Sequence, residues 1–224
     1  MKTASQIITA FLLCTIISCS FPDRPNISPQ KPLYLGVAYD VSGSVEELEL
    51  PVMTMQHVEK IVSLVKKRGG AVGLGLIDEK AFEPLTRLEL ERVAGKLNER
   101  ARINQKNAQA ESEFKALVDG KINRPRNARR TDIKGSIARF ALFFGEPTIP
   151  ADAEKLAIFI SDGIDTGPWR KLSGIRLPED VKVFVVGMER GLAEKLFGKQ
   201  AILFESIDAA IESLNSKSAR EPRS

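Results

Sequence analysis

The chain has 224 residues and a net charge of +4, and 43% of its residues are hydrophobic against 28% charged. This balance is ordinary for a globular protein and excludes collagen-like, wholly disordered and multi-span membrane classes. Only two cysteines, Cys14 and Cys19, and one histidine, His57, are present. A disulfide framework, a cysteine zinc finger and a histidine-rich metal site are therefore excluded, and a Ser-His-Asp triad is disfavoured.

Residues 1–18 have the pattern of an export signal. A positive start precedes the apolar run 7–17, which is shorter than the roughly 20 residues needed to span a bilayer. The segment ends in Ile-Ile-Ser-Cys at Cys19 and resembles the bacterial lipobox, in which the cysteine is acylated and becomes the new N-terminus. An ordinary secretory signal cut near Ser18 or Ser20 is the alternative. The resemblance implies an extracytoplasmic lipoprotein anchored through Cys19, and Ser20 after it favours the outer membrane.

Residues 19–32 separate this segment from the folded part of the chain. They contain four prolines and no apolar periodicity, which is typical of an extended, solvated tether. We therefore expect one folded domain at residues 33–216, followed by a frayed tail at residues 217–224.

Short apolar runs alternate with amphipathic segments along this domain. The runs at 156–160 and 181–186 are nearly continuous and aliphatic, as in parallel strands that are covered on both faces. The alternation predicts an α/β fold with three layers, in which a mostly parallel central sheet carries helices on both faces. In chain order the expected elements are strand 33–39, helix 51–68, strand 71–77, edge strand 84–90, helix 132–144, strands 156–160 and 181–186, helix 190–197, strand 201–204 and helix 206–214.

The segment 91–130 departs from this alternation. It is highly charged, and a weak apolar stripe with a polar stretch in its middle runs along it. The members of the stripe are Leu90, Val93, Leu97, Ala101, Phe114, Leu117 and Val118. We expect a charged helical insertion here, either one long surface helix or a pair of helices, that partly projects from the domain.

Oxygen-bearing side chains follow two of the expected strands. Asp40, Ser42 and Ser44 come after strand 33–39, Asp162 comes after strand 156–160, and Thr131 opens helix 132–144. Ligands of open α/β sheets bind outside the carboxyl ends of the strands, so these side chains should meet if the two strands are neighbours. Two carboxylates and three hydroxyls suit a hard cation and leave part of its coordination open. Mg²⁺ or Mn²⁺ is expected ahead of Ca²⁺.

This set of residues resembles the metal-ion-dependent adhesion site of the von Willebrand factor A domain. The motif of that family is Asp-x-Ser-x-Ser, then a separate Thr and a separate Asp, and the five residues above fill it. The resemblance covers about residues 33–214 and departs from the family pattern in the charged insertion. It implies a von Willebrand factor A fold, a bound Mg²⁺ or Mn²⁺, and a protein partner whose Asp or Glu supplies the last ligand. Most members of the family are binding modules and not enzymes.

Two further aspartates lie near the motif. Asp132 and Asp165 could support the metal ligands from behind. Asp132 is more simply explained as the N-cap of the helix that follows it.

Residues 100–134 contain ten basic and four acidic residues, so the whole positive surplus of the chain lies here. We expect a positive rim beside the metal that attracts an acidic protein. Its members are Arg124, Arg126, Arg129 and Arg130. A solvated loop without a binding role is the alternative. Nucleic-acid binding is not expected, because Phe114 is the only aromatic residue in this stretch and the signal directs the chain out of the cytoplasm.

Trp169 follows the strand that leads to Asp162. It is either an anchor that faces the partner or a cover over the end of the sheet. The sequence does not separate these two roles.

The leading hypothesis is a membrane-tethered, metal-dependent binding module. One alternative is a hydrolase in which Asp40 is the nucleophile and a metal activates phosphate. Such enzymes carry a second acid two positions later, and Ser42 stands there instead. Another alternative is a scaffold that acts through the charged insertion. The oligomeric state stays open.

Overall fold

The computed structural model describes residues 30–80, 83–167 and 174–218. The export signal, Cys19, most of the tether, Trp169 and residues 219–224 lie outside these ranges. None of the helices in the described ranges is both long and apolar enough to cross a membrane.

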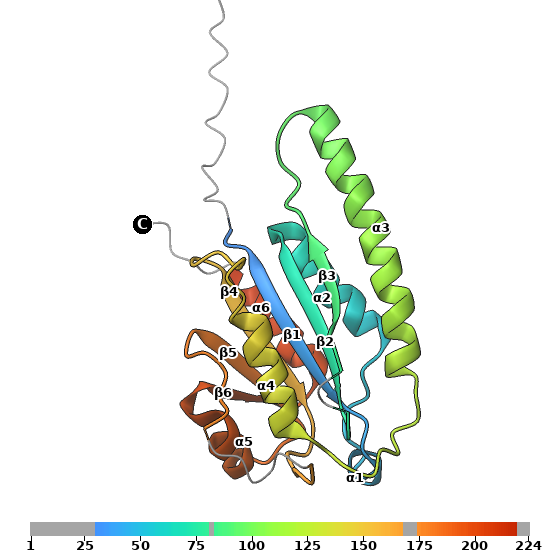
Figure 1. The fold of residues 1–224 in the computed structure, drawn as a ribbon, viewed down its shortest axis with the longest axis vertical. Coiled ribbons are helices and arrows are strands. Elements are labelled where there is room, and N and C mark those ends of the chain that lie inside the picture. The colour runs from blue at the N-terminus through green and yellow to red at the C-terminus, as the bar shows by residue number, and fades with distance from the viewer. Residues whose placement is uncertain (1–29, 81–82, 168–173, 219–224) are drawn as a thin grey trace, which may run out of the picture.

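A six-stranded sheet forms the centre of the molecule, with the order β3-β2-β1-β4-β5-β6 (Figure 1). All neighbouring pairs are parallel except β2 with β3, which is antiparallel and puts β3 at the edge, as its sequence predicts. The strands are β1 Leu33–Asp40, β2 Gly70–Ile77, β3 Thr86–Leu90, β4 Glu154–Ile160, β5 Val181–Val186 and β6 Ala201–Phe204.

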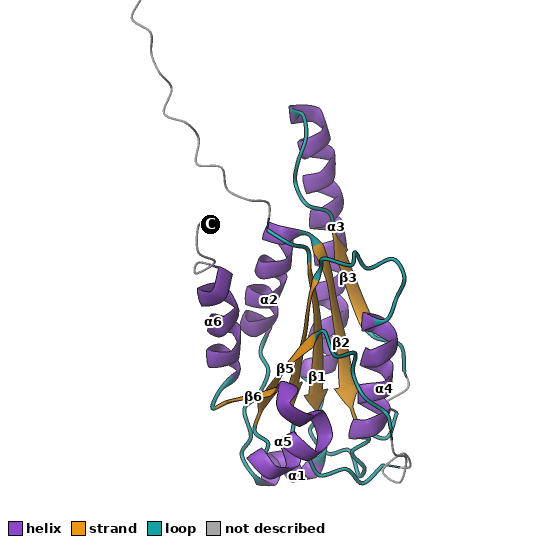
Figure 2. Ribbon diagram, turned by 90° about the vertical axis from the view of Figure 1, so that its left-hand side faces the viewer, coloured by secondary structure: helices purple, strands orange, loops and turns teal. Residues whose placement is uncertain are grey.

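Helices cover both faces of the sheet, so the predicted three-layer α/β architecture is confirmed (Figure 2). Helices α2, α3 and α6 pack on one face and α4 and α5 on the other. The helices are α1 Gly43–Glu47, α2 Met55–Arg68, α3 Leu97–Ile122, α4 Ile133–Phe144, α5 Arg190–Phe197 and α6 Ile207–Ser218, with a 3-10 turn at Gly198–Gln200.

Helix α4 approaches the sheet very closely because glycine stands beneath it. A Cβ atom on Gly36 of β1 would lie 2.6 Å from the Phe140 ring, which is far inside van der Waals contact. Phe140 and Phe144 are fully buried against this part of the sheet. The position of α4 matters for the site, because the residues that start this helix are Thr131 and Asp132.

Of the two arrangements expected for the segment 91–130, the structure shows a single helix, α3, and not a pair. The stripe predicted for its first part is wrong. Leu90 belongs to β3, Leu97 is 81% exposed, and Leu117 is 62% exposed. The buried side of α3 consists of Ile103, Asn107, Phe114, Val118 and Ile122. The helix packs beside α2 and β3, and its first turns extend beyond the sheet (Figure 1).

A buried amide explains why a helix of such polar sequence docks on the sheet. Asn107 is 1% exposed, accepts a hydrogen bond from the Glu91 N–H (3.1 Å) and donates one to the Glu91 carbonyl (2.7 Å). The amide thus satisfies both backbone groups of the residue after β3, as a neighbouring strand would. Apolar periodicity does not report such a contact.

The segment between β1 and α2 also differs from its prediction. The turn expected after β1 contains the short helix α1, and the helix expected from residue 51 begins at Met55. Thr54 sets this later start, because its side chain accepts from the His57 N–H while the His57 ring accepts from the Thr54 N–H. This capping box fixes the N-terminus of α2 at Met55.

Candidate metal centre

Strands β1 and β4 are neighbours and end at the same edge of the sheet. Tyr39 pairs with Ile160 in the parallel register, so Asp40 and Asp162 follow adjacent strand ends. The condition for the two carboxylates to meet is therefore fulfilled.

Asp40 is fully buried and held from two directions. Its Oδ1 accepts the Ser42 N–H (2.9 Å), and its Oδ2 accepts the Ser161 hydroxyl (2.6 Å). Burial raises the pKa of Asp40, and the nearby Asp162 carboxylate adds to this, while the hydrogen bonds from Ser161 and Ser42 oppose it. The carboxylate is thus rigidly placed in a setting that lacks a compensating positive charge.

The hydroxyls of Ser42 and Ser44 lie 3.1 Å apart. Ser42 is the N-cap of α1, yet its side chain makes no capping hydrogen bond to that helix. Ser42 is 2% exposed, and Ser44 is half-buried. The helix start therefore orients two neighbouring hydroxyl oxygens without using them for capping.

Asp162 has one oxygen that is used and one that is not. Its Oδ1 accepts the Ile164 N–H (2.8 Å), which shapes the loop after β4. Its Oδ2 is buried and has no hydrogen-bond partner among the described residues. A buried polar atom left without a partner costs about 1–3 kcal/mol, and more when it is charged.

Thr131 is 3% exposed and joins its segment to the loop that carries Asp162. Its carbonyl accepts the N–H groups of Thr166 (2.9 Å) and Gly167 (2.8 Å), and its N–H donates to the Thr166 hydroxyl (2.9 Å). Three residues earlier, the Ala128 N–H donates to the Val41 carbonyl (3.0 Å). Backbone hydrogen bonds thus bring the three segments that carry the five predicted residues to one edge.

Asp132 and Asp165, the two further aspartates near the motif, each accept a backbone hydrogen bond. Asp132 caps α4, because its Oδ1 accepts the Gly135 N–H (2.9 Å), which confirms the simpler of its two interpretations. Burial raises the pKa of Asp132. Asp165 accepts the Gly167 N–H (3.2 Å) and so stabilises the loop after Asp162.

The predicted positive rim is only partly a surface. Arg129 and Arg130 are exposed, and neither has an ion-pair partner in the described part of the chain. Arg124 pairs with the buried Asp78 (3.4 Å), and Arg126 points inward, donating to the Leu50 carbonyl (2.9 Å). The rest of the basic stretch is spread along α3, apart from Lys134 in α4. In α3, Lys106 pairs with Glu91 near the opposite end of the sheet.

Sequence reasoning missed Ser161. The Ser161 hydroxyl donates to Asp40 and also accepts the Gly163 N–H (3.1 Å), so one fully buried serine links the two strand ends. A serine just before the aspartate that follows β4 was the available signal, but only the pairing of β1 with β4 gives that serine its partner.

These residues fit a hard cation better than a soft one. Within the described ranges, no group of three or more His, Cys, Asp and Glu side chains is arranged to hold a metal, so a metal here would depend on the hydroxyls as well as on the two carboxylates. Oxygen-only sets of this kind bind Mg²⁺ and Mn²⁺ with several waters retained. The free Oδ2 of Asp162 is the atom that such a cation would satisfy.

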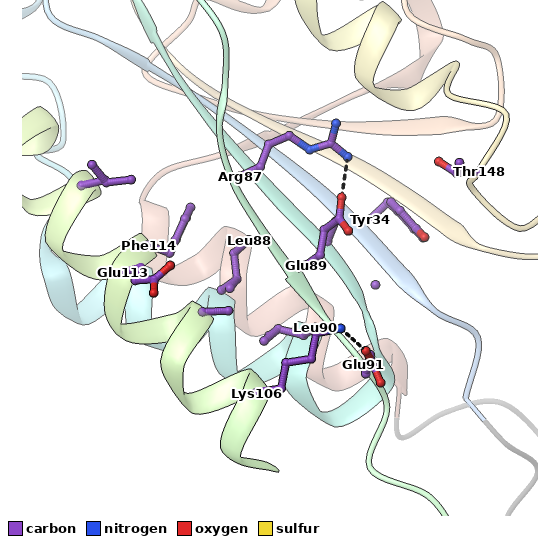
Figure 3. A pocket seen from close by; sticks show the side chains of 14 residues that line it. Tyr34, Arg87, Leu88, Glu89, Leu90, Glu91, Lys106, Glu113, Phe114 and Thr148 are labelled. Carbon is purple, nitrogen blue, oxygen red and sulfur yellow. Dashed lines mark hydrogen bonds and ion pairs between the residues drawn. The ribbon is translucent and has the colours of Figure 1, made fainter. Parts of the chain in front are cut away.

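A groove of about 540 Å³ lies elsewhere, beside β3 and α3 (Figure 3). Among its charged residues, Arg87 pairs with Glu89 (3.2 Å) and Lys106 with Glu91, and Glu113 accepts a hydrogen bond from Gln109 (3.0 Å). These charged groups of the groove therefore already have partners within the chain.

No protein-family model matches the sequence, and no curated protein matches it. Among solved structures, the chain is similar to the pilus adhesin SpaC from Lactobacillus rhamnosus GG in its open conformation (11% identity, 85% of this chain and 30% of that one, TM-score 0.48). It is also similar to a von Willebrand factor type A protein from Catenulispora acidiphila (15% identity, 85% and 42%, TM-score 0.46). A third similar structure is proximal thread matrix protein 1 from the mussel byssus (13% identity, 84% and 47%, TM-score 0.44).

The chain spans less than half the length of each of these proteins. All three TM-scores lie below 0.5. The class of this protein is therefore defined by its own strand order and layers: an α/β domain with a six-stranded, mostly parallel sheet and a cluster of oxygen-bearing side chains at the carboxyl ends of the strands.

Proposed function

We propose that the protein is a membrane-tethered, divalent-metal-dependent binding module for an acidic protein. Asp40, Ser42, Ser44, Thr131 and Asp162 would hold Mg²⁺ or Mn²⁺, directly or through water. The observation that carries the proposal is the buried, unpartnered Oδ2 of Asp162 beside a second buried carboxylate. The bound cation would supply an electrophilic position that a carboxylate of the partner completes.

The surroundings of the site favour a protein over a small ion as the partner. Leu48 and Ile164 are exposed (57% and 49%), and both are tied to site residues: the Leu48 N–H donates to the Ser44 carbonyl (3.0 Å) and the Ile164 N–H donates to Asp162. Exposed aliphatic side chains on these loops, together with the exposed Arg129 and Arg130 of the segment before Thr131, are typical of a protein contact surface.

The position of the tether supports this role. The chain enters the domain at the amino end of β1, and the site lies at the carboxyl end of the same strand, about 26 Å away for eight residues (Figure 1). If Cys19 is lipidated, in what we expect to be the outer membrane of a bacterial envelope, the tether joins the end of the domain opposite to the site. An attachment at that end leaves the site open to a partner.

A hydrolytic role of Asp40 has less support. Both oxygens of its carboxylate accept hydrogen bonds, from Ser42 and Ser161. Hydrogen bonds to a carboxylate stabilise its charged form and so weaken it as a nucleophile. No second acid stands at position 42 to protonate a leaving group.

Thermal unfolding of the full chain, purified in detergent, tests the proposal with Mg²⁺ or Mn²⁺ against EDTA. Metal at about 100 times its Kd should add about 2.7 kcal/mol to the free energy of unfolding. Asp40→Asn should abolish this gain and should unfold at a higher temperature than wild type in EDTA, because it removes a buried charge. The exposed Asp152 gives the control variant Asp152→Asn, which should behave as wild type. Equal melting temperatures of wild type with and without metal would contradict the proposal.

A further inference from the structure

Arg126 belongs to the predicted rim by sequence, but its guanidinium lies inside the molecule. Its Nε and Nη2 atoms are buried and have no hydrogen-bond partner among the residues that the structure describes, and its Cζ lies 5.6 Å from the centre of the Tyr39 ring. Tyr39 is fully buried and immediately precedes Asp40. The described part of the chain places no carboxylate in ion-pair contact with this guanidinium. A surface contact with an acidic partner is therefore not its role.

The one hydrogen bond of this guanidinium joins two segments of the metal site. Nη1 donates to the Leu50 carbonyl (2.9 Å), and the Leu50 N–H donates to the Val45 carbonyl (3.0 Å) at the end of α1. The Leu50 side chain also covers Gly187 after β5, where a Cβ atom would lie 3.1 Å from it. Arg126 thus holds the chain that returns from the loop of Ser42 and Ser44.

The other side of the contact is the segment that leads to Thr131. Two residues after Arg126, Ala128 forms hydrogen bonds with Val41 (3.0 Å) and Gly43 (3.2 Å). The segment of Arg126 is therefore attached to the loop after β1 through Ala128 and to the chain after α1 through the Arg126 guanidinium. A planar guanidinium can lie over an aromatic ring and donate sideways at the same time, which an ammonium group cannot do equally well.

We propose that Arg126 is a positioning residue of the metal site, which sets the affinity for the divalent cation by holding the Thr131 segment against the loop of Asp40, Ser42 and Ser44. This inference rests on the function proposed above. It predicts that replacement of Arg126 weakens the binding of the cation, because a positioning contact is lost. Electrostatics alone predicts the opposite, since removal of a nearby positive charge should strengthen the binding of a cation.

The test measures Mn²⁺ affinity of the full chain in detergent, from the electron paramagnetic resonance signal of free Mn²⁺ at constant ionic strength. Arg126→Gln should raise the Kd about tenfold or more, as is usual when a group behind a metal ligand is lost. Arg129→Gln is the matched control, since it removes the same charge from an exposed position three residues away. Its Kd should equal that of wild type or lie below it. Arg126→Lys should fall between wild type and Arg126→Gln.

The possible outcomes distinguish a failure of the inference about Arg126 from a failure of the proposed function. If Arg126→Gln binds Mn²⁺ as tightly as Arg129→Gln while its melting temperature in EDTA is lower, Arg126 only stabilises the fold and the inference is overturned. If Arg126→Gln does not fold, Arg126→Lys decides, and wild-type affinity in that variant overturns the inference. If wild type itself takes up no Mn²⁺ and matches Asp40→Asn, the proposed function fails and the inference fails with it.

Discussion

Strand β4 has a carboxylate near each of its ends, and the two lie in opposite surroundings. At its amino end, Glu154 accepts hydrogen bonds from Arg68 and Lys182, both at 2.8 Å. Burial by itself would raise the pKa of Glu154, but these two cations outweigh it and lower the pKa. This carboxylate is compensated, and it holds β4 to the end of α2 and to β5.

At the carboxyl end, Asp162 and its neighbour Asp40 have no cation in contact within the described residues, and burial raises the pKa of Asp40. The fold thus compensates a buried charge where the charge serves the structure and leaves it uncompensated at the edge where a ligand would supply the positive charge. The difference indicates which end of the sheet is functional more clearly than composition does.

The largest effect is expected from Asp162→Asn, which removes the uncompensated charge. The Mn²⁺ affinity should fall by more than the roughly 10–100-fold typical of a group behind a metal ligand, because a weakly coordinating amide replaces a ligand carboxylate. In EDTA the variant should be at least as stable as wild type. Titration with Mn²⁺ and thermal unfolding measure both properties, with Asp152→Asn as the control. An unchanged affinity for Mn²⁺ would show that Asp162 is not a metal ligand.

Asn107→Ala tests the contact between α3 and the end of β3, which lies at the end of the sheet opposite to the proposed metal site. It leaves the Glu91 N–H and carbonyl without partners, so we expect a loss of about 2 kcal/mol in the free energy of unfolding. Urea denaturation measures this loss, and Gln109→Ala, on an exposed turn of the same helix, is the control. The Mn²⁺ affinity should stay at the wild-type value. A drop in affinity comparable to that of Asp162→Asn would mean that the two edges are coupled.

Glu154→Gln should cost about 1 kcal/mol at pH 7, a modest value because Glu154 keeps 25% of its side-chain surface exposed. The pKa of Glu154 is lowered on folding, so its contribution is present above the unfolded value near 4.5 and is lost as the pH falls through the lower folded value. The difference between wild type and Glu154→Gln in urea denaturation should therefore shrink as the pH falls below about 5. A difference in the free energy of unfolding that grows on acidification would contradict the lowered pKa of Glu154.

The smallest effect on stability is expected from the double variant Arg129→Gln, Arg130→Gln, within about 0.5 kcal/mol of wild type. Its association with a dye-labelled poly-glutamate peptide, measured by stopped flow on the Mg²⁺-loaded chain, should slow severalfold at low salt. The difference should vanish at about 1 M salt, where the Debye length is about 3 Å. Arg102→Gln with Lys106→Gln removes equal charge from α3 and should leave the rate unchanged.

Much of the fold could be predicted because its signals are local. The apolar runs that became β1, β4 and β5 are short and nearly continuous, and the helical stripe of α4 is regular. Of the two arrangements expected for the charged insertion, the structure shows the single long helix, and Phe114 and Val118 of the predicted stripe are buried, whereas Leu97 and Leu117 are exposed. The residue that the prediction missed is Asn107, a buried polar side chain that periodicity counts as surface. Its burial depends on the backbone groups of Glu91, which no local pattern reports.

The five proposed ligands could be found from their residue types and their order after strands. The residues that contact the segments carrying these ligands could not be found in this way. Ser161 reaches Asp40 only because β1 and β4 are neighbours, and Arg126 reaches the Leu50 carbonyl only because the chain after α1 passes close to it. These contacts join segments separated by 121 residues for Ser161 and Asp40 and by 76 for Arg126 and Leu50.

The sequence by itself determined the layered α/β class, the edge position of β3 and the oxygen-bearing residues at strand ends. The export signal with Cys19 stays a prediction. Only the tertiary structure decided which strand ends meet, which carboxylates lack a cation, and which arginine of the basic stretch points inward. The reason is physical: hydrophobic periodicity encodes which face of an element is buried. The electrostatic state of a buried group depends on neighbours that strand order and packing bring from distant parts of the chain.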